Sequence, residues 1–344
     1  SMKRFGFLQK AETYLKEAGM EVELFEGIEP DPSVDTVMKG AAAMEKFQPD
    51  WIVAIGGGSP IDAAKAMWIK YEYPDITFED MCKVFGIPKL RKKAHFCAIS
   101  STSGTATEVT AFSIITDYQK GIKYPIADFE ITPDVAIVDP ELAETMPKKL
   151  VAHTGMDALT HAIEAYVSTA NSDYTDPLAL HAIKMIQEDL IGSYNEDMEK
   201  RDAMHNAQCL AGMAFSNVGL GVDHGMAHPL SALHDIPHGV ACAMLLPTVM
   251  KFNAPAALPK YVDIAKALGV YKDGMTQQEA ADAACAEIDN LSRLVGIPTH
   301  LSELGITEKD IDALADQAIV DVCTPGNPRE VTRDDIVALY KQIL

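Results

Sequence analysis

The sequence of 344 residues is long enough to bury a large core, and its content of 48% hydrophobic and 23% charged residues is typical of a globular protein. Its 50 acidic residues outnumber its 29 basic ones, and the net charge of -21 argues against nucleic acid as a partner because phosphate backbones are repelled. No apolar run approaches the roughly 20 residues that a membrane-spanning helix needs, so no membrane partner is expected either.

The first part of the chain alternates two kinds of pattern. Short apolar runs bounded by Gly, Pro or charged residues predict strands at Val22–Phe25, Trp51–Ile55, Phe96–Ile99 and Val135–Val138. Helical patterns between the earlier runs predict helices at Phe7–Ala18, Val34–Lys46 and Ile61–Tyr71. Strands that alternate with helices predict an α/β domain with a mainly parallel sheet, which we place at residues 1–147.

After Pro147 the strand patterns end and helical patterns fill the chain. The predicted helices are Asp157–Val167, Pro177–Leu190, Ala203–Phe215, Ala241–Lys251, Ala256–Leu268, Gln277–Val295 and Glu308–Ala318. The sequence therefore predicts an all-helical domain at residues 148–344.

The six cysteines indicate a reducing compartment. None of them forms a C-x-x-C pair, and several, such as Cys97, lie in apolar surroundings. This pattern is typical of reduced core thiols in a cytoplasmic protein rather than of a disulfide framework or a cysteine-bound zinc site.

A glycine-rich turn, Gly56-Gly57-Gly58, follows the strand predicted at residues 51–55. Ser59 is a favoured helix cap and Pro60 suits the first helical position, so the turn is expected to open a helix whose amides suit a pyrophosphate. The plainer alternative is a tight turn without a ligand, because the spacing is not G-x-G-x-x-G. Residues 100–108, rich in Ser and Thr, follow the next strand and would lie along the same edge of the sheet, although such a loop alone is also ordinary.

Asp157 and His161 are four residues apart on a predicted helix, so both side chains project from one face. An ion pair on a helix surface would explain them equally well if they stood alone. However, four further histidines lie within fifteen residues of an apolar, glycine-rich stretch: His224, His228, His234 and His238. Imidazoles with one carboxylate suit Fe(II), Zn(II) or a similar ion, although spacing does not choose which three histidines bind it. The other histidines are assigned to structure or surface: His95, His153, His181, His205 and His300.

With these motifs the chain resembles the iron-dependent (group III) alcohol dehydrogenases, a family that includes butanol, 1,2-propanediol and 1,3-propanediol dehydrogenases. It is also similar to the alcohol dehydrogenase half of bifunctional aldehyde-alcohol dehydrogenases. The resemblance extends over essentially the whole chain, and its motifs match in order and spacing: GGGSPIDAAK, TSGTATEVT, KYPIADFEITPD, GMDALTHAIEAY and HGMAHPL followed by PHGVA.

The resemblance implies a metal site at Asp157, His161, His224 and His238, with Fe(II) as the family's metal and Zn(II) as the alternative. It places His228 beside the nicotinamide, where we expect it to relay the alcohol proton. The metal would act as a Lewis acid on the alcohol or carbonyl oxygen while hydride passes to or from the cofactor. Phe215 and Leu220 match positions that shape an apolar substrate pocket.

The resemblance also implies that residues 1–147 bind NAD or NADP and that residues 148–344 bind the metal and a small alcohol or aldehyde, in a dehydroquinate synthase-like architecture. The matched cofactor positions are Gly57, Gly58, Ser59, Asp62, Ser101, Thr102, Thr105, Phe112, Lys123 and Leu142. The family further implies a homodimer in the cytoplasm, active in fermentation.

The chain departs from the family in two places. TSGTATE stands where TSGTGSE is commoner, so Ala106 and Thr107 are expected to narrow this loop slightly. Family members also begin with about 35 to 40 further residues, which carry a first strand and another glycine-rich turn. Ser1 is expected to follow that turn, so the preference for NAD or NADP is not readable from this sequence.

Two other readings stay open. Dehydroquinate synthases, glycerol-1-phosphate dehydrogenases and glycerol dehydrogenases resemble the same architecture, but phosphorylated substrates would call for basic residues near the metal. Between Ala152 and Lys251 the basic residues are few and none adjoins a proposed ligand: Lys184, Lys200, Arg201 and Lys251. The alternative from another class is a non-catalytic assembly fragment, since the bifunctional relatives form filaments.

Overall fold

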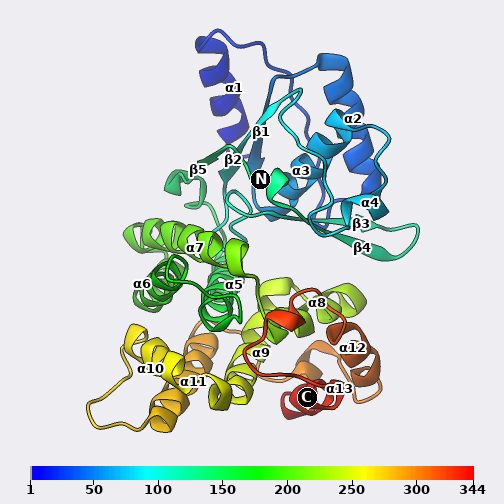
Figure 1. Ribbon diagram of the computed structural model, residues 1–344. Coiled ribbons are helices and arrows are strands. Elements are labelled where there is room, and N and C mark those ends of the chain that lie inside the picture. The colour runs from blue at the N-terminus through cyan, green and yellow to red at the C-terminus, as the bar shows by residue number, and fades with distance from the viewer. Residues whose placement is uncertain (1) are drawn as a thin grey trace. The chain divides into compact units, whose positions relative to one another are not determined.

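The protein is described by a computed structural model that covers residues 2–344 (Figure 1). The chain forms two compact units, each described here by itself. Unit 1 comprises the residues up to Thr102 together with Ala106–Leu142, and unit 2 comprises Ser103–Thr105 and Ala143–Leu344.

Unit 1 is built around a parallel sheet of three strands in the order β1-β2-β5. The strands are β1 (Trp51–Gly56), β2 (His95–Ser100) and β5 (Val135–Ile137). The accompanying helices are α1 (Phe7–Glu17), α2 (Val34–Phe47), α3 (Gly58–Glu72) and α4 (Phe78–Met81), with short 3₁₀ turns η1 (Phe129–Ile131) and η2 (Pro140–Leu142). The predicted mainly parallel sheet is confirmed.

The register of the sheet brings the two predicted cofactor loops together. Gly56 at the end of β1 pairs with Ser100 at the end of β2, and the Ser101 amide donates a hydrogen bond of 2.8 Å to the Gly56 carbonyl. Parallel strands place their carboxyl ends at one edge, so the glycine turn and the Ser/Thr-rich loop start side by side.

One strand prediction in unit 1 was wrong, and one hairpin was not predicted. Val22–Phe25 is not a strand: it is a largely exposed segment to which no other strand pairs within residues 2–344. A short apolar run needs a neighbouring strand to satisfy its backbone groups, and alternation alone does not supply one. Conversely, an antiparallel hairpin of β3 (Phe112–Asp117) and β4 (Ile122–Ala127) was not predicted.

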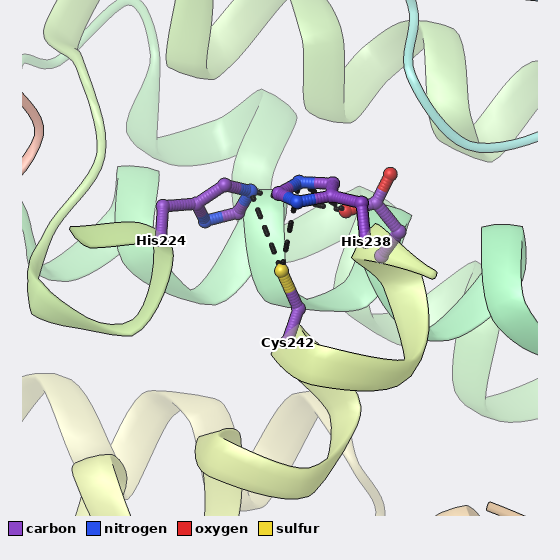
Figure 2. A group of neighbouring side chains, drawn as sticks. His224, His238 and Cys242 are labelled. Carbon is purple, nitrogen blue, oxygen red and sulfur yellow. Dashed lines mark hydrogen bonds and ion pairs between the residues drawn. The ribbon is translucent and has the colours of Figure 1, made fainter. Parts of the chain in front are cut away.

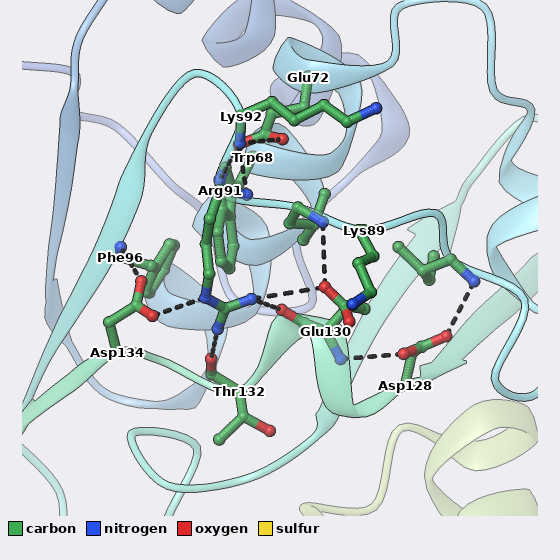
Figure 3. Close-up of polar contacts among 12 residues, drawn as sticks. Trp68, Glu72, Lys89, Arg91, Lys92, Phe96, Asp128, Glu130, Thr132 and Asp134 are labelled. Atoms are coloured by element: carbon green, nitrogen blue, oxygen red, sulfur yellow. Dashed lines mark hydrogen bonds and ion pairs between the residues drawn. The ribbon is translucent and has the colours of Figure 1, made fainter.

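Helix α3 lies in the core of unit 1. Its Trp68 is fully buried, and the indole ring lies 5.2 Å from the ring of Phe96 on β2. The segment leading into β2 wraps around the end of α3, where Glu72 accepts hydrogen bonds from Trp68 and from backbone amides (Figure 3). Arg91 stacks on Trp68 and bonds Asp134, so this corner is fixed by charge as well as by packing.

Unit 2 contains no strand among the described residues from 143 onward, so the predicted all-helical second half is confirmed. Its helices are α5 (Lys148–Val167), α6 (Asp176–Tyr194), α7 (Met198–Val218), α8 (Val222–His234), α9 (His238–Asn253), α10 (Leu258–Ala267), α11 (Gln277–Leu294), α12 (Ile311–Ala318) and α13 (Arg333–Gln342). Short 3₁₀ turns are η3 (Ala254–Ala256), η4 (Leu301–Leu304) and η5 (Thr324–Gly326). Helix α5 packs against α6, α7 and α9 and forms the centre of the unit.

Local sequence explains several of the helix starts. The side chain of Asp197 caps α7 through the amides of Glu199 and Lys200, and Thr276 with Glu279 forms a capping box on α11. Helices α8 and α13 were not predicted. None of the described helices is long and apolar enough to cross a membrane.

Candidate metal centre and cofactor residues

Three helices of unit 2 bring the proposed ligands together. Asp157 and His161 lie one turn apart on α5, His224 lies in the first turn of α8, and His238 opens α9. Figure 2 shows the His224 and His238 rings directed toward one another. Helix α5 is far from the other two helices in the sequence, and the packing of the three brings the polar ends of the four side chains close together.

The spacing within this group is that of a metal site rather than of a hydrogen-bonded cluster. Asp157 Oδ1 lies 3.8 Å from His161 Nε2, 3.8 Å from His224 Nε2 and 3.5 Å from His238 Nε2. These separations are longer than good hydrogen bonds. Ligands at about 2.1 Å around a tetrahedral ion stand roughly 3.4 Å apart, which is close to the observed values.

Asp157 Oδ1 is also an unsatisfied buried atom. It makes no hydrogen bond within the described residues, and the side chain is almost completely buried, with only 4% of it exposed. A buried carboxylate oxygen without a partner costs free energy, so this position fits a bound cation.

Electrostatics keeps the imidazoles in the form that binds a metal. Burial lowers the pKa of His161 to about 4 and that of His224 to about 3, so both rings are neutral at pH 7. Burial raises the pKa of Asp157, and the neighbouring His161 opposes that rise. Neutral imidazole nitrogens and a carboxylate are ligands for Fe(II) or Zn(II).

Glu164 supports His224 from behind. Its Oε2 lies 2.6 Å from His224 Nδ1, and its Oε1 accepts a hydrogen bond of 2.8 Å from the Asp223 amide. Burial raises the pKa of Glu164 to about 7, and the backbone amides of residues 221, 223 and 224 oppose that rise. A carboxylate on Nδ1 directs the Nε2 lone pair toward Asp157, as in many metal sites.

Cys242 lies beside the same group, one turn after His238 on α9. Its Sγ is 3.8 Å from His224 Nε2 and 3.6 Å from His238 Nε2 (Figure 2). Asp157, His224, His238 and Cys242 present ligand atoms that all lie within 4.8 Å of one another. Burial raises the pKa of this thiol well above its ordinary value, so at neutral pH it is a thiol.

His228 and Phe215 adjoin the group from two sides. The His228 ring stacks on His238 with 5.4 Å between centroids, and its Nδ1 lies 2.8 Å from Asp321 Oδ2. Phe215 stacks on His161 with 4.2 Å between centroids and is 4% exposed. Leu220 is 8% exposed and lies between α7 and α8.

The glycine turn of unit 1 requires a glycine at position 56. Gly56 has φ +152, and a Cβ there would lie 2.8 Å from Cγ of Pro60. A Cβ on Gly57 would lie 3.0 Å from Cγ2 of Thr102, so the second loop packs directly on the turn. Helix α3 starts at Gly58 with Gly57 as its cap, so the prediction of Ser59 as the cap and Pro60 as the first helical residue was wrong. Because the first helical amides have no intrahelical acceptor, Pro60 fits equally well further into the first turn.

The Asp62 carboxylate, unlike the glycines of the turn, is occupied by hydrogen bonds within the chain. It accepts hydrogen bonds from Thr107 Oγ1 at 2.7 Å and from the Ile114 amide at 3.1 Å. Burial raises its pKa, and the nearby Lys65 opposes that rise. These contacts connect α3 to the following loop and to β3, so Asp62 has a structural role. Its contact with the cofactor stays a prediction.

The remaining proposed cofactor residues are spread over both units. Thr102 Oγ1 in unit 1 and Thr105 Oγ1 in unit 2 are buried and make no hydrogen bond within residues 2–344. Phe112 opens β3, and Lys123 on β4 pairs with Asp31 at 3.0 Å. Leu142, 5% exposed, ends η2.

The sequence interpretation missed Glu164, Cys242 and Asp321. Helical spacing could have indicated the first two, since Glu164 lies seven residues after Asp157 on α5 and Cys242 lies four after His238 on α9. No sequence pattern links Asp321 to His228, because the two are brought together only by tertiary packing.

Comparisons with known proteins agree with this geometry. Residues 1–140 match the family model of iron-containing alcohol dehydrogenase, and residues 151–344 match the C-terminal model of the Fe-containing alcohol dehydrogenase family. The NADPH-dependent butanol dehydrogenase of Clostridium saccharobutylicum is 58% identical over 345 residues, which cover 99% of this chain and 88% of the relative.

Two further relatives extend the comparison. The bifunctional aldehyde-alcohol dehydrogenase AdhE of Escherichia coli (strain K12) is 40% identical over 98% of this chain and 41% of its own length. A crystal structure of 1,3-propanediol oxidoreductase superposes with a TM-score of 0.94 at 38% identity, covering 98% of this chain and 88% of that chain. The chain belongs to the iron-containing alcohol dehydrogenase family and is an NAD(P)-dependent alcohol dehydrogenase.

Proposed function

We propose that this alcohol dehydrogenase interconverts small primary alcohols and aldehydes and that it holds Fe(II) through Asp157, His161, His224 and His238. The observation that carries the proposal is the unpaired, buried Asp157 Oδ1, with three imidazole nitrogens 3.5 to 3.8 Å away. Zn(II) fits the same donors, and availability decides between the two ions.

When bound, the ion supplies Lewis acidity toward the alcohol or carbonyl oxygen. Asp157 supplies the charge that a divalent cation needs in a buried site, and Glu164 holds His224 in the tautomer that can coordinate. His228, 28% exposed in its side chain, can pass a proton between the substrate hydroxyl and solvent.

The proposed cofactor contacts follow the chemistry of the two adjacent loops. The amides at the start of α3, at Gly57, Gly58 and Ser59, suit a pyrophosphate, and the hydroxyls of Ser101, Thr102 and Thr105 supply further polar contacts. The proposed set of cofactor residues also includes Asp62, Phe112, Lys123 and Leu142. Of these, Asp62 is proposed to act by holding the loop of residues 100–108 in place.

The substrate end of the site is proposed to be apolar. Phe215 and Leu220 are both buried, and Phe215 lies against His161. A terminal hydroxyl buried against such residues without a partner costs about 1–3 kcal/mol, which corresponds to roughly 5- to 150-fold in kcat/KM. We therefore expect 1-butanol to be preferred over 1,3-propanediol by that margin.

The test is anaerobic butanal reduction by the Fe(II)-loaded chain, followed separately with NADH and NADPH and accompanied by iron analysis. Turnover that requires iron supports the proposal, and the ratio of rates gives the cofactor preference. Bound iron without reduction of butanal would contradict the proposed substrate class.

Two of the four basic residues between Ala152 and Lys251 have partners that argue against a phosphorylated substrate. Lys200 pairs with Asp189 at 2.7 Å, and Arg201 donates to the carbonyls of Glu144 and Ser193. These cations are occupied within the helical scaffold.

We also propose a homodimer that works in the cytoplasm in a fermentative pathway. The six cysteines are free thiols, which supports a reducing compartment. Light scattering coupled to size-exclusion chromatography tests the dimer, and a filament or a monomer would contradict it.

A further inference from the structure

His228 is held by a carboxylate outside the proposed metal centre. Its Nδ1 lies 2.8 Å from Asp321 Oδ2, and the other oxygen, Oδ1, accepts a hydrogen bond of 2.9 Å from the Cys323 amide. Both oxygens therefore have partners. Burial alone would raise the pKa of Asp321, but the hydrogen bonds from His228 and Cys323 lower it below its ordinary value. Asp321 is an anionic acceptor, so the proton on this edge belongs to His228 Nδ1.

The segment that carries Asp321 is fitted closely to α8. A Cβ on Gly225 of α8 would lie 2.2 Å from Thr324 Oγ1, and Asn327 Oδ1 accepts a hydrogen bond of 3.3 Å from the Val222 amide. These contacts lie along the same helix that carries His228. The backbone on both sides of the pair is therefore fixed, and the pair does not depend on a flexible surface side chain.

His228, Asp321 and Cys323 also present ligand atoms within 4.8 Å of one another, so a second metal site has to be considered. The distance decides against it. The 2.8 Å between His228 Nδ1 and Asp321 Oδ2 is a hydrogen bond, whereas ligands around one ion stand roughly 3.4 Å apart. The contacts of Asp157 in the proposed metal centre, at 3.5 to 3.8 Å, have the wider spacing.

We propose that Asp321 is a positioning residue that fixes the tautomer and ring orientation of His228, leaving Nε2 unprotonated as the acceptor for the substrate hydroxyl proton. The inference rests on the proposed function, because it assigns Asp321 to the proton relay of that site. Since Nδ1 is occupied by Asp321, Nε2 lies on the opposite side of the ring, which stacks on His238.

The proton balance is simple. When an alcohol is oxidised, its carbon loses a hydride to NAD(P)⁺ and its hydroxyl proton passes to His228 Nε2. The ring then carries a proton on each nitrogen, and it releases the Nε2 proton to solvent. The Nδ1 proton stays between His228 and Asp321 throughout.

The first test reads the tautomer directly and does not depend on activity. The zinc-loaded chain, which is diamagnetic, is labelled with ¹⁵N-histidine, and the side-chain nitrogens of His228 are assigned by loss of their signals in His228→Gln. We expect a protonated Nδ1 and an unprotonated Nε2. In Asp321→Asn the amide can donate to Nδ1, so the tautomer is expected to invert. A wild-type chain protonated at Nε2 would overturn the inference.

The second test separates positioning from binding. Asp321→Asn is expected to lower kcat by roughly ten- to a hundredfold with KM changed by less than about threefold, because general acid–base catalysis contributes at about this level. Asp321→Glu keeps the carboxylate and is expected to retain more activity. Asp316→Asn, which removes an exposed carboxylate paired with Arg333, serves as the matched control and is expected to change neither constant.

A double-mutant cycle completes the design. If Asp321 acts through His228, Asp321→Asn added to His228→Gln lowers kcat no further. Additive losses would overturn the inference, as would loss of the bound metal from Asp321→Asn, which would make Asp321 a ligand. An inactive wild-type chain would instead defeat the proposed function, and the tautomer measurement would still report on Asp321.

Discussion

Two buried carboxylates, one in each unit, show opposite ways of placing a charge inside a protein. Glu72 in unit 1 accepts hydrogen bonds from the Trp68 indole and from the backbone amides of Arg91 and Lys92 (Figure 3). The amides of residues 93 and 94 also donate to it. Asp157 in unit 2 leaves Oδ1 without any hydrogen bond in the described structure. The first carboxylate is satisfied by the chain itself, and the second indicates a ligand that the chain does not supply.

The strongest way to test this comparison is to neutralise Asp157. Asp157→Asn keeps the size of the side chain, so the fold is expected to persist while metal affinity falls by at least about a thousandfold and turnover is lost. Because an unpaired buried charge is removed, the metal-free variant is expected to be at least as stable as the metal-free parent. Metal content and urea unfolding measure the two effects.

Asp189→Asn is the matched control for that experiment. Asp189 is also buried in unit 2, but it is paired with Lys200 at 2.7 Å. We expect it to retain the metal and to lose stability. If Asp157→Asn kept its iron and its turnover, the proposed ligand set would be wrong.

The next effect concerns stability rather than metal. Glu72→Gln replaces an acceptor of several amides by a side chain that turns an NH₂ toward some of them, so we expect a loss of about 2–4 kcal/mol in the free energy of unfolding. Metal content should stay unchanged. Urea unfolding of the metal-free chain measures the loss, and Glu45→Gln, at an exposed pair with Lys93, is the control expected to change stability by less than about 0.5 kcal/mol. Equal losses in both variants would contradict the role given to Glu72.

Glu164 lies between these two cases. Both of its carboxylate oxygens have partners within the chain, and one of those partners is the proposed metal ligand His224. In Glu164→Gln the amide oxygen can still accept from the Asp223 amide, while the NH₂ faces His224 Nδ1 and favours a proton on Nε2, where the metal is proposed to bind. We expect metal affinity to fall by roughly ten- to a hundredfold with little change in fold. Competition with a metal chelator measures it, and the exposed Glu188→Gln should match the parent.

The comparison also explains what the sequence could predict. Helices such as α2 and α11 follow from the periodicity of their apolar residues. The caps that the structure shows at Ser33 and Thr276 were not part of that prediction. The pairing of Asp157 with His161 follows from helical spacing. These helices and this pairing depend on local properties of the chain, and both were predicted.

Features that depend on tertiary packing were missed. Helix α8 contains Gly225 and Pro229, which lower helix propensity, and it forms because its residues are buried against α9 and α12. The Val22–Phe25 segment has strand composition, but no strand pairs with it within residues 2–344. The partner that satisfies His228 lies 93 residues away. Such contacts leave no periodic trace in the sequence.

The smallest predicted effect is a pH dependence at Glu29 in unit 1. This carboxylate accepts from the Ser33 amide at 2.8 Å and from Thr36 Oγ1, at the start of α2. Burial raises its pKa, but these hydrogen bonds prevail and lower it to about 2. Since the folded value lies below the ordinary 4.5, the stabilisation is complete above pH 4.5 and is lost as the pH falls toward 2.

Glu29 is only half-buried, so we expect Glu29→Gln to cost less than about 1 kcal/mol at pH 7. The difference from the parent should shrink between pH 4.5 and 2, because the protonated parent then carries the same charge as the variant. Urea midpoints across this range measure it, with Glu26→Gln as the exposed control. A difference that grew on acidification would contradict the sign and would mean that the hydrogen bonds at Ser33 and Thr36 do not favour the carboxylate.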